Sequence, residues 1–477
     1  MDSLTKAKQI PAVQSLLFAA FLMFLCGGAS AAANILMGAT RGLSAFCVDP
    51  FGTTKILGGE DGRSAREGGL DAVGAGNSVE TLSFVVTSAA DIAALSVTCD
   101  GLSSSVGKIA PEKIDIVLVK PWYQDGNAWF TELRDPDGRV LVPELVLHND
   151  ALVRTDEKSR ANTILSSGKY ISADEVAVAD KDTVRLQSFA LKANAARQLF
   201  LRIRIDAETP AGIYKGKLAL AADGAPAGTA EITLRVLSYA LPAPKSRFSD
   251  AHFIFATADT VVNLPAFFTG LSRESLAKDG YVVAAKEDPI LAAKRKYHIF
   301  TTPATQRQLQ ARRTISAVSL NAAPPTPGLE NPSVWRRAKG LAAYLDGYDG
   351  ILIPQLAEKT AVWSENHGEY RSRSLIYPAT DGRFIPTLAF LALEDAYYDV
   401  CYLSLVEQAA TALLDSTDLK TAVEGRRALA WLADIAPASD APATVRLDAI
   451  AWLERLRMVK TQPPGAVKDG KDSEDGK

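Results

Sequence analysis

The stretch Leu201-Arg202-Ile203-Arg204-Ile205-Asp206 alternates apolar and charged side chains. Successive side chains of a β-strand point to opposite faces, so this pattern predicts a strand with one buried face. The same period of two recurs at Ile114–Val119 and at Ile232–Leu237, and turn sequences such as Asp137-Gly138 and Asp223-Gly224 separate such runs. Many short alternating strands between turns are typical of a β-sandwich rather than of a βαβ fold.

The pattern changes after the Pro-rich connector Leu241–Lys245. Short apolar runs, each typical of a buried strand, then alternate with helical patterns, which predicts parallel strands. These runs are Phe253–Phe255, Tyr297–Phe300, Ile315–Leu320 and Gly350–Ile353. The helical patterns are at Arg273–Asp279, Gln306–Arg312 and Pro332–Leu345. Four strands in roughly 110 residues are too few for a full (β/α)8 barrel, which needs about 200 residues or more. The sequence therefore predicts a reduced barrel-like domain.

The N-terminus is typical of a secretory signal peptide. Lys6 and Lys8 give a positive start, the apolar run Leu16–Cys26 is too short to span a bilayer, and Ala29-Ser30-Ala31 ends it with small residues. We predict cleavage after this segment and a secreted or periplasmic location. No later stretch is apolar and long enough to cross a membrane, so we predict no membrane span.

The predicted fold class is multidomain β plus α/β: two β-sandwich-like modules, then a reduced TIM-barrel-like domain with a helical C-terminal segment. The predicted divisions are a signal peptide at 1–31, sandwich modules at 32–121 and 122–244, the barrel-like domain at 245–385, helices at 386–461 and a disordered tail at 462–477. The helical segment shows three- and four-residue spacing of apolar side chains. Trp335, Trp431 and Trp452 fall in helical patterns, and we expect all three in the core.

Composition excludes several functions. The net charge is −3 with both signs interspersed, whereas nucleic-acid binding requires a basic patch. The four histidines are scattered without metal-ligand spacing, and neither a dinucleotide fingerprint nor a nucleophile elbow is present. We predict no metal and no cofactor. Pairing of Cys47 with Cys99 is left open, and Cys401 is expected to be a buried thiol.

Several phrases occur in a characteristic order along the chain: Val119–Gln124, Val142–Asp150, Arg197–Leu201, Glu208–Gly216, Asn331–Arg337, Asp346–Gly350, Tyr377–Gly382, Ile385–Leu388 and Tyr398–Leu403. In these phrases the chain resembles bacterial glycoside hydrolases of the exo-β-N-acetylgalactosaminidase type, which carry β-sandwich modules before a (β/α)8 barrel. The resemblance implies a glycan or polysaccharide as the partner, with amino-sugar-containing glycans as one class.

The resemblance also implies where catalysis belongs. In this family, an adjacent Asp-Glu pair ends a middle barrel strand: the acid protonates the leaving oxygen, and its neighbour orients the substrate acetamido group as an internal nucleophile. Here the corresponding interval, Ala258–Tyr297, is only about 40 residues long and offers Glu287-Asp288 in reversed order. Neighbouring strand residues point to opposite faces, so reversal directs the acid away unless the register shifts.

Both residues have a simpler interpretation, in which Asp288 caps a helix and Pro289 is its first residue. A second acidic pair, Asp174-Glu175, falls in the sandwich region, where strand edges and turns routinely carry charges. We therefore name Glu287 and Asp288 as the candidate catalytic residues and treat Asp174-Glu175 as a surface pair.

Sugar sites combine aromatic rings with polar groups, because the apolar face of a sugar packs on a ring while its hydroxyls need partners. The loop after the last barrel-like strand offers this combination, and such loops carry the active sites of barrels. Its candidate substrate-binding residues are Trp363, Glu365, Asn366, His367, Tyr370 and Arg371. Trp122, Tyr123 and Trp129 form another aromatic cluster, for which a packing role is the favoured interpretation.

Two functions remain open from the sequence. The first is an exported glycoside-hydrolase-like protein that acts on or binds extracellular glycans. The second is a catalytically inactive carbohydrate-binding or structural protein of the cell envelope, a possibility raised by the short Ala258–Tyr297 interval. Whether the chain is an enzyme is therefore undecided at this stage.

Overall fold

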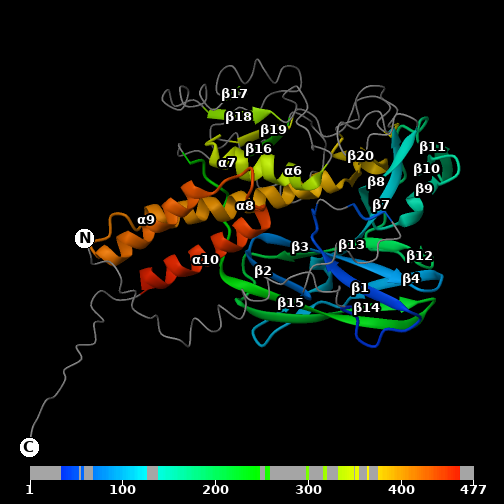
Figure 1. Cartoon of the computed structure of the whole chain (residues 1–477), viewed down its shortest axis with the longest axis horizontal. Coiled ribbons are helices and arrows are strands. Elements are labelled where there is room, and N and C mark those ends of the chain that lie inside the picture. The colour runs from blue at the N-terminus through cyan, green and yellow to red at the C-terminus, as the bar shows by residue number, and fades with distance from the viewer. Residues whose placement is uncertain are drawn as a thin grey trace, which may run out of the picture. The chain divides into compact units, whose positions relative to one another are not determined.

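The computed structural model describes residues 34–52, 55–57, 68–125, 138–247, 253–257, 297–299, 315–319, 331–348, 350–353, 363–364 and 374–461. The chain divides into two compact units, whose elements are labelled in Figure 1. The first unit comprises Met1–Gln124, Arg139–Ala173 and Ala179–Ala240, and the second comprises Asp125–Gly138, Asp174–Val178 and Leu241–Lys477. The predicted connector at Leu241–Lys245 therefore begins the last and longest segment of the second unit.

The first unit is built on two β-sheets. One has five strands in the order β1-β3-β13-β7-β8. The other has seven strands, with the order β12-β4-β14-β15-β2 along its main path, while β5 pairs with β14 and β6 pairs with β5. Their bounds are β1 (Leu43–Val48), β2 (Leu70–Gly76), β3 (Ser78–Ser88), β4 (Ile92–Cys99), β5 (Leu102–Ser103), β6 (Lys108–Ile109), β7 (Ile114–Asp125), β8 (Arg139–Leu147), β12 (Phe189–Leu191), β13 (Ala196–Ile205), β14 (Gly212–Ala222) and β15 (Ala225–Ala240).

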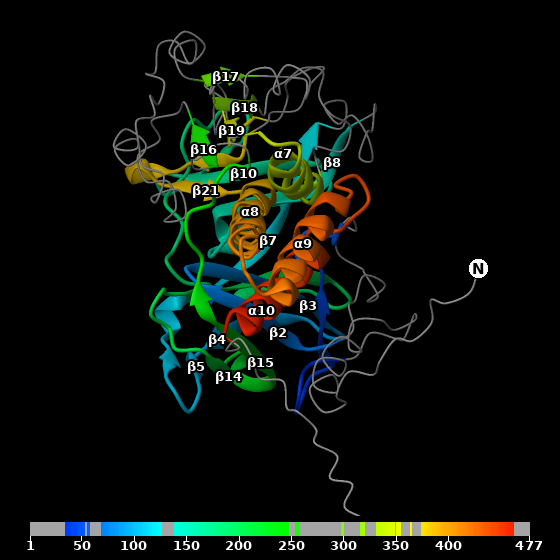
Figure 2. The same cartoon turned by 90° about the vertical axis from the view of Figure 1, so that its left-hand side faces the viewer.

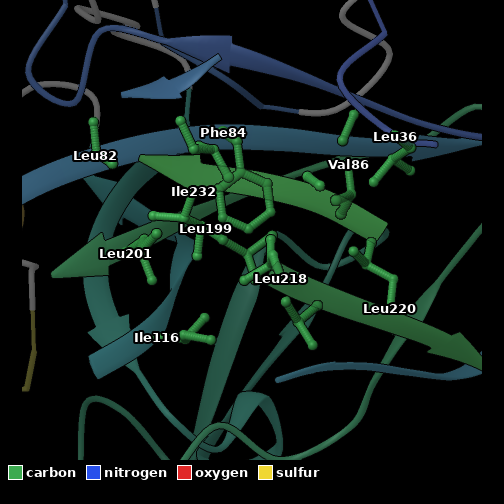
Figure 3. Packing of buried hydrophobic residues seen from close by; sticks show 14 of the residues in the cluster. Leu36, Leu82, Phe84, Val86, Ile116, Leu199, Leu201, Leu218, Leu220 and Ile232 are labelled. Carbon is green, nitrogen blue, oxygen red and sulfur yellow. The ribbon is translucent and has the colours of Figure 1, made fainter. Parts of the chain in front are cut away.

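One hydrophobic core lies between these sheets. Phe84 on β3 and Leu199 on β13 belong to the same buried cluster as Leu218 on β14 and Ile232 on β15, as Figure 3 shows. All four side chains are fully buried. Burial of a side chain of this size contributes about 1.5–3 kcal/mol, so this shared core is what joins the two sheets into a sandwich.

Strand β13 confirms the alternation predicted for it. It pairs antiparallel with β3 on one side and with β7 on the other. Leu201, Ile203 and Ile205 enter the core, whereas Arg202 is half-buried and Arg204 is exposed. The period of two therefore identified both the strand and the face that it buries.

The prediction of two separate sandwich modules is corrected by the strand order. Strands from both predicted modules share each sheet, because β3 pairs with β13 and β4 pairs with β14. The predicted boundary between residues 121 and 122 falls inside β7. Alternation shows that a strand is half-buried but carries no information about its partner, so the pattern could not reveal that distant strands pair.

A small antiparallel sheet, in the order β11-β10-β9, also belongs to the first unit. Its strands are β9 (Val153–Asp156), β10 (Ala161–Ser166) and β11 (Lys169–Ser172). Short 3₁₀ turns precede β7 and β9, at η2 (Pro111–Lys113) and η4 (Asp150–Leu152). Cys47, Cys99 and Cys401 are all outside disulfides. Cys401 is buried as expected, and the Cys47–Cys99 pair that the sequence left open is not formed in this structure.

The second unit contains a four-stranded parallel sheet in the order β16-β19-β18-β17. Its strands are β16 (Ile254–Thr257), β17 (Tyr297–Ile299), β18 (Ile315–Ser319) and β19 (Gly350–Ile353). All four fall on the predicted apolar runs, and their parallel direction is confirmed. The helices predicted at Arg273–Asp279 and Gln306–Arg312 lie outside the described residues, as do the signal peptide and the tail from residue 462.

A helix of mixed geometry covers the predicted range Pro332–Leu345. It consists of α6 (Pro332–Arg336), the π-helical segment η5 (Arg337–Ala342) and α7 (Ala343–Leu345). The Asn331 side chain accepts a hydrogen bond from the Ser333 amide at 3.0 Å, and Pro332 occupies the first helical position. This capping satisfies one of the amides that a helix start leaves without a partner.

Three further helices are described in the second unit: α8 (Leu388–Thr411), α9 (Leu419–Asp434) and α10 (Pro442–Thr461). They confirm the predicted helical segment at residues 386–461. Helices α9 and α10 both pack against α8 (Figure 2), which explains why α8 buries residues on all of its sides. Among the residues that the structure describes, no helix has both the length and the apolar run needed to cross a membrane.

Candidate functional site

The carboxyl edge of the parallel sheet is the first place to look for a site, because open parallel sheets and barrels bind ligands there. The strands end at Thr257, Ile299, Ser319 and Ile353, and the residues directly after each end lie outside the described ranges. The candidate catalytic residues Glu287 and Asp288 also lie outside them. The same holds for the predicted binding residues Glu365, Asn366, His367, Tyr370 and Arg371.

Trp363 is described, and its indole ring is fully buried. Its Nε1 donates a hydrogen bond to the Pro378 carbonyl at 3.1 Å, and its ring centroid lies 4.8 Å from that of Tyr377. A ring enclosed in this way has no free face, so its burial argues against the sugar-stacking role predicted for Trp363. The indole instead joins its own segment to the hairpin formed by β20 (Ile376–Pro378) and β21 (Phe384–Pro386).

Ser364 connects this segment to an acidic pair from far away in the sequence. Its Oγ donates a hydrogen bond to Asp174 Oδ1 at 2.8 Å. Asp174 and Glu175 are exposed, and Asp174–Val178 belongs to the second unit although its flanks belong to the first. The sequence had indicated only a surface pair of the sandwich. Nothing local could have revealed the contact, because 190 positions separate the two residues.

The hairpin beside Trp363 leads directly into α8. Its tip is the 3₁₀ turn η6 (Thr380–Gly382), in which Asp381 adopts a positive φ of 63°. Thr387 Oγ1 donates to the Leu375 carbonyl at 2.8 Å and accepts from the Phe390 amide at 3.2 Å, so it caps the helix while it closes the hairpin. Two of the phrases that carry the family resemblance lie here, and both have a structural role.

A buried cluster of four charged side chains joins α6, α8 and α10 of the second unit. Arg336 and Arg446 both contact Asp399, with Nε–Oδ distances of 2.7 and 2.6 Å. Asp395 supplies the second carboxylate, 3.2 Å from Arg336 Nη1. Burial opposes the charge of Arg336, but the carboxylates of Asp399 and Asp395 outweigh it and raise the pKa of Arg336. Two positive and two negative charges compensate one another, as burial of ions requires.

The first unit contains a buried carboxylate of its own. Glu144 Oε2 accepts a hydrogen bond from Trp122 Nε1 at 2.8 Å and a second from Gln124 Nε2. Trp122 and Gln124 are fully buried, and Tyr123 between them is nearly so. These contacts confirm the packing interpretation of Trp122 and Tyr123, whereas Trp129 lies outside the described residues. Two more of the resembling phrases are thus joined by hydrogen bonds between β7 and β8.

His148 lies between two carboxylates in the first unit. Its Nε2 is 2.7 Å from Asp115 Oδ1 on β7, and its Nδ1 is 3.3 Å from Asp182 Oδ2. Burial disfavours the charged imidazole, but the hydrogen bonds and charges of both carboxylates outweigh burial and raise the pKa of His148 to about 9. His148 is therefore a cation at neutral pH, which suits an ion-pair anchor and not a neutral metal ligand.

Within the described ranges, no group of three or more His, Cys, Asp or Glu side chains is arranged to hold a metal ion. The described polar groups are mostly engaged in holding strands and helices together. Asp174 of the exposed Asp174-Glu175 pair contacts Ser364, and Ser364 directly precedes the predicted binding residues in the chain.

Comparisons with known proteins place this fold. No family model matches the chain, and no curated protein matches it. A family 123 glycoside hydrolase from Clostridium perfringens, described for the hydrolysis of glycolipid glycans, is similar over 87% of this chain and 100% of its own, with a TM-score of 0.52 and 10% identity. The N-terminal domain of a Streptococcus gordonii adhesin aligns over 35% of this chain and 30% of its own, at 7% identity and a TM-score of 0.17, which is too low to carry an argument. The chain therefore has a glycoside-hydrolase-like fold.

Proposed function

We propose that this chain is an exported protein that binds or cleaves extracellular glycans, with amino-sugar-containing glycans as one class. The observation that carries the proposal is the likeness to a glycoside hydrolase that acts on glycolipid glycans, which extends over the whole of that chain. Fold likeness by itself does not transfer an activity. The proposal therefore also rests on the order of the parallel strands and on the contacts that fix Trp363 and Ser364.

The order of the parallel strands supports a reduced barrel. From edge to edge the sheet runs β17-β18-β19-β16, so consecutive strands are neighbours and the first strand lies beside the last. In a (β/α)8 barrel the strands have this cyclic order, because the sheet closes on itself. The order has one break, between β16 and β17, and the sequence there provides about 40 residues in place of several βα units.

The proposed binding residues Glu365, Asn366, His367, Tyr370 and Arg371 follow Trp363 and Ser364 in the chain. Both preceding residues are fixed, one by the Pro378 carbonyl and the other by Asp174. A rigid base next to binding residues reduces the conformational entropy that ligand binding would cost. In this proposal Trp363 is a positioning residue, and the polar residues after it contact the glycan.

Hydrolysis, where it occurs, is assigned to Glu287 and Asp288. One carboxylic acid would protonate the leaving oxygen, and the neighbouring carboxylate would orient the acetamido group of the substrate, as in substrate-assisted glycosidases. The reversed order of this pair and the short Ala258–Tyr297 interval favour the alternative that catalysis is lost and recognition is retained. The alternative retains the fold and the glycan partner but requires no pair of opposed carboxylates.

Two assays on the mature protein separate these outcomes. The first is a glycan array, and the second measures release of chromophore from aryl hexosaminides and hexosides. Turnover that falls by at least about 100-fold in Glu287→Gln or Asp288→Asn establishes a hydrolase with the assigned residues. Glycan binding without turnover establishes a recognition protein. Absence of both overturns the proposal and leaves the structural envelope role.

Matched variants test the binding loop. His367→Ala and Asn366→Ala should weaken glycan binding by about tenfold each, because each removes a hydrogen bond worth about 1–1.5 kcal/mol to the bound ligand. Lys217→Ala, on an exposed position of β14, is the control and should bind as the parent does. If the loop variants and the control bind equally, the glycan site lies elsewhere on the chain.

A further inference from the structure

The hairpin of α9 and α10 carries two indole rings that the helical spacing had predicted to be core. Trp431 on α9 and Trp452 on α10 are instead half-buried, whereas Trp335 is buried as expected. The centroids of the two half-buried rings lie 6.3 Å apart, and their planes are tilted by 39°. The second unit therefore has an aromatic pair at its surface, which we call the Trp431–Trp452 surface.

The position of the pair follows from how the two helices pack. The buried residues of helix α9 form one stripe, Ala422, Gly425, Ala428 and Leu432. Trp431 directly precedes Leu432, and Trp452 directly precedes the buried Leu453 of α10. Each indole thus lies at the rim of a buried stripe, where part of the ring packs on its neighbour and part remains in contact with solvent. Both rims meet at the junction of α9 and α10.

Two guanidinium groups border this surface. The Arg455 guanidinium lies 5.2 Å from the centroid of the Trp452 ring, and its Nε is 2.5 Å from Glu424 Oε2. Arg427 Nη1 is 2.8 Å from the other carboxylate oxygen of Glu424. The arginine side chains are 48% and 60% exposed, whereas Glu424 is only 14% exposed. One carboxylate is shared by two cations, and both guanidinium groups reach solvent.

This chemistry selects a class of ligand. The apolar C–H face of a pyranose ring packs on an indole, and an exposed guanidinium binds carboxylate or sulfate through paired N–H donors. We propose that the Trp431–Trp452 surface binds an anionic polysaccharide, with the sugar rings on the indoles and its acidic groups at Arg427 and Arg455. This binding surface is distinct from the carboxyl edge of the parallel sheet and does not require hydrolysis.

Binding of the mature protein to three probes tests the proposal: polygalacturonate for uronates, chondroitin sulfate for sulfates and dextran as a neutral chain. We expect binding to one or both acidic probes and none to dextran. Trp431→Ala and Trp452→Ala should each weaken binding by about tenfold. Arg455→Gln should weaken binding and reduce its dependence on salt, because one ionic contact is lost.

Matched controls keep the result interpretable. Leu419→Ala and Arg426→Gln replace exposed residues of the same helix α9 that have no described contact with the indoles, and both should bind as the parent does. Far-ultraviolet circular dichroism and the unfolding temperature of each variant confirm that it is folded. If folded Trp431→Ala and Trp452→Ala bind as the parent does, or if dextran binds equally well, the proposal is overturned.

Residues 462–477 are the competing occupant, because they follow α10 directly and include the acidic residues Asp469, Asp472, Glu474 and Asp475 beside three lysines. A variant that ends at Thr461 tests them. Binding by both the full chain and this variant supports the polysaccharide. Binding that appears only after truncation overturns it for the full chain and assigns the surface to the tail. Because only binding to these probes is measured, failure here leaves the hydrolysis and glycan-array results unaffected.

Discussion

Arg336 donates two hydrogen bonds to Asp399 inside the helical part of the second unit, from Nε to Oδ2 at 2.7 Å and from Nη2 to Oδ1 at 2.9 Å. The pair joins α6 to α8, and Arg446 extends the contact to α10 through the same carboxylate. Asp399 is therefore the shared acceptor for two buried cations. Two parallel N–H donors bind a carboxylate more strongly than a single hydrogen bond does.

Asp399→Ala should destabilise the second unit by about 3–5 kcal/mol, because it leaves two buried guanidinium groups with insufficient negative charge. Hydrogen exchange at the amides of α8 and α10 measures the change where it should occur. Glu231→Ala, which breaks an exposed ion pair with Lys215, is the control and should leave exchange unchanged. If hydrogen exchange in Asp399→Ala is as slow as in the parent, the cluster contributes no stability.

Gly340→Ala should separate the helix 332–345 from α8. A Cβ at residue 340 would lie 2.6 Å from the Ala396 Cβ and 2.9 Å from the Ala396 carbonyl oxygen. Overpacking of this kind should lower the free energy of unfolding by about 1–3 kcal/mol. Denaturant unfolding measures this loss. The double variant Gly340→Ala with Ala396→Gly removes the nearest atom and should recover part of the loss. No recovery would show that backbone approach, not the Ala396 side chain, limits the space.

Stability of the first unit should depend on pH through His148. Its pKa of about 9 in the folded protein is above its usual value, so the contribution is complete below about pH 6.5 and is lost as the pH rises through 9. His148→Gln should therefore lower the unfolding temperature at pH 6–7 and have little effect above pH 9.5. The loss at neutral pH should be about 1–3 kcal/mol, because Asp115 is partly exposed and screened. A difference that grows with pH would contradict this assignment.

The pH dependence also involves the charged side chains around the His148 imidazole. Asp115 on β7 and Asp182 face its two nitrogens, and Arg202 and Arg204 of β13 act on Asp115. Burial raises the pKa of Asp115, but His148 and the two arginines outweigh it, so the net shift is downward. The change near pH 9 therefore belongs to His148.

Export gives a separate prediction. Expression with the native N-terminus in a bacterial host should yield a mature protein that begins after the small-residue segment Ala29-Ser30-Ala31, recovered from the periplasm or the medium. N-terminal sequencing of the purified protein identifies the cleavage position. Replacement of Ala29 and Ala31 by Leu should block cleavage. An intact Met1 on cytoplasmic protein would contradict the signal-peptide assignment.

In the described part of the second unit, the sequence predicted most of the helices and strands. The helical pattern located the helix at residues 332–345, and the apolar runs located the four described parallel strands, because helix and strand signals are local. The partners of the sandwich strands could not be predicted, since β3 and β13 pair across more than a hundred positions. Pairing of this kind depends on the whole fold and not on the period of either strand.

Aromatic side chains show the same limit at the candidate sites. Trp363 was predicted to be exposed in a loop, yet the Pro378 carbonyl and Tyr377 enclose it. Trp431 and Trp452 were predicted to be core, yet they lie at the rim of their helices. The spacing of apolar residues locates the buried face of a helix to within about one residue position. An error of one position is enough to exchange a ring in the core for a ring at the surface. The predictions for Glu287 and Asp288 stay predictions.

The most direct test of the glycan-related function is a glycan array with the purified mature protein, run beside hydrolysis of chromogenic hexosaminides. The proposed function predicts specific binding to at least one glycan family that is weakened by His367→Ala, whether or not turnover occurs. Neither binding nor turnover across the array, with a folded protein, would contradict the glycan assignment and leave a structural role for this glycoside-hydrolase-like fold.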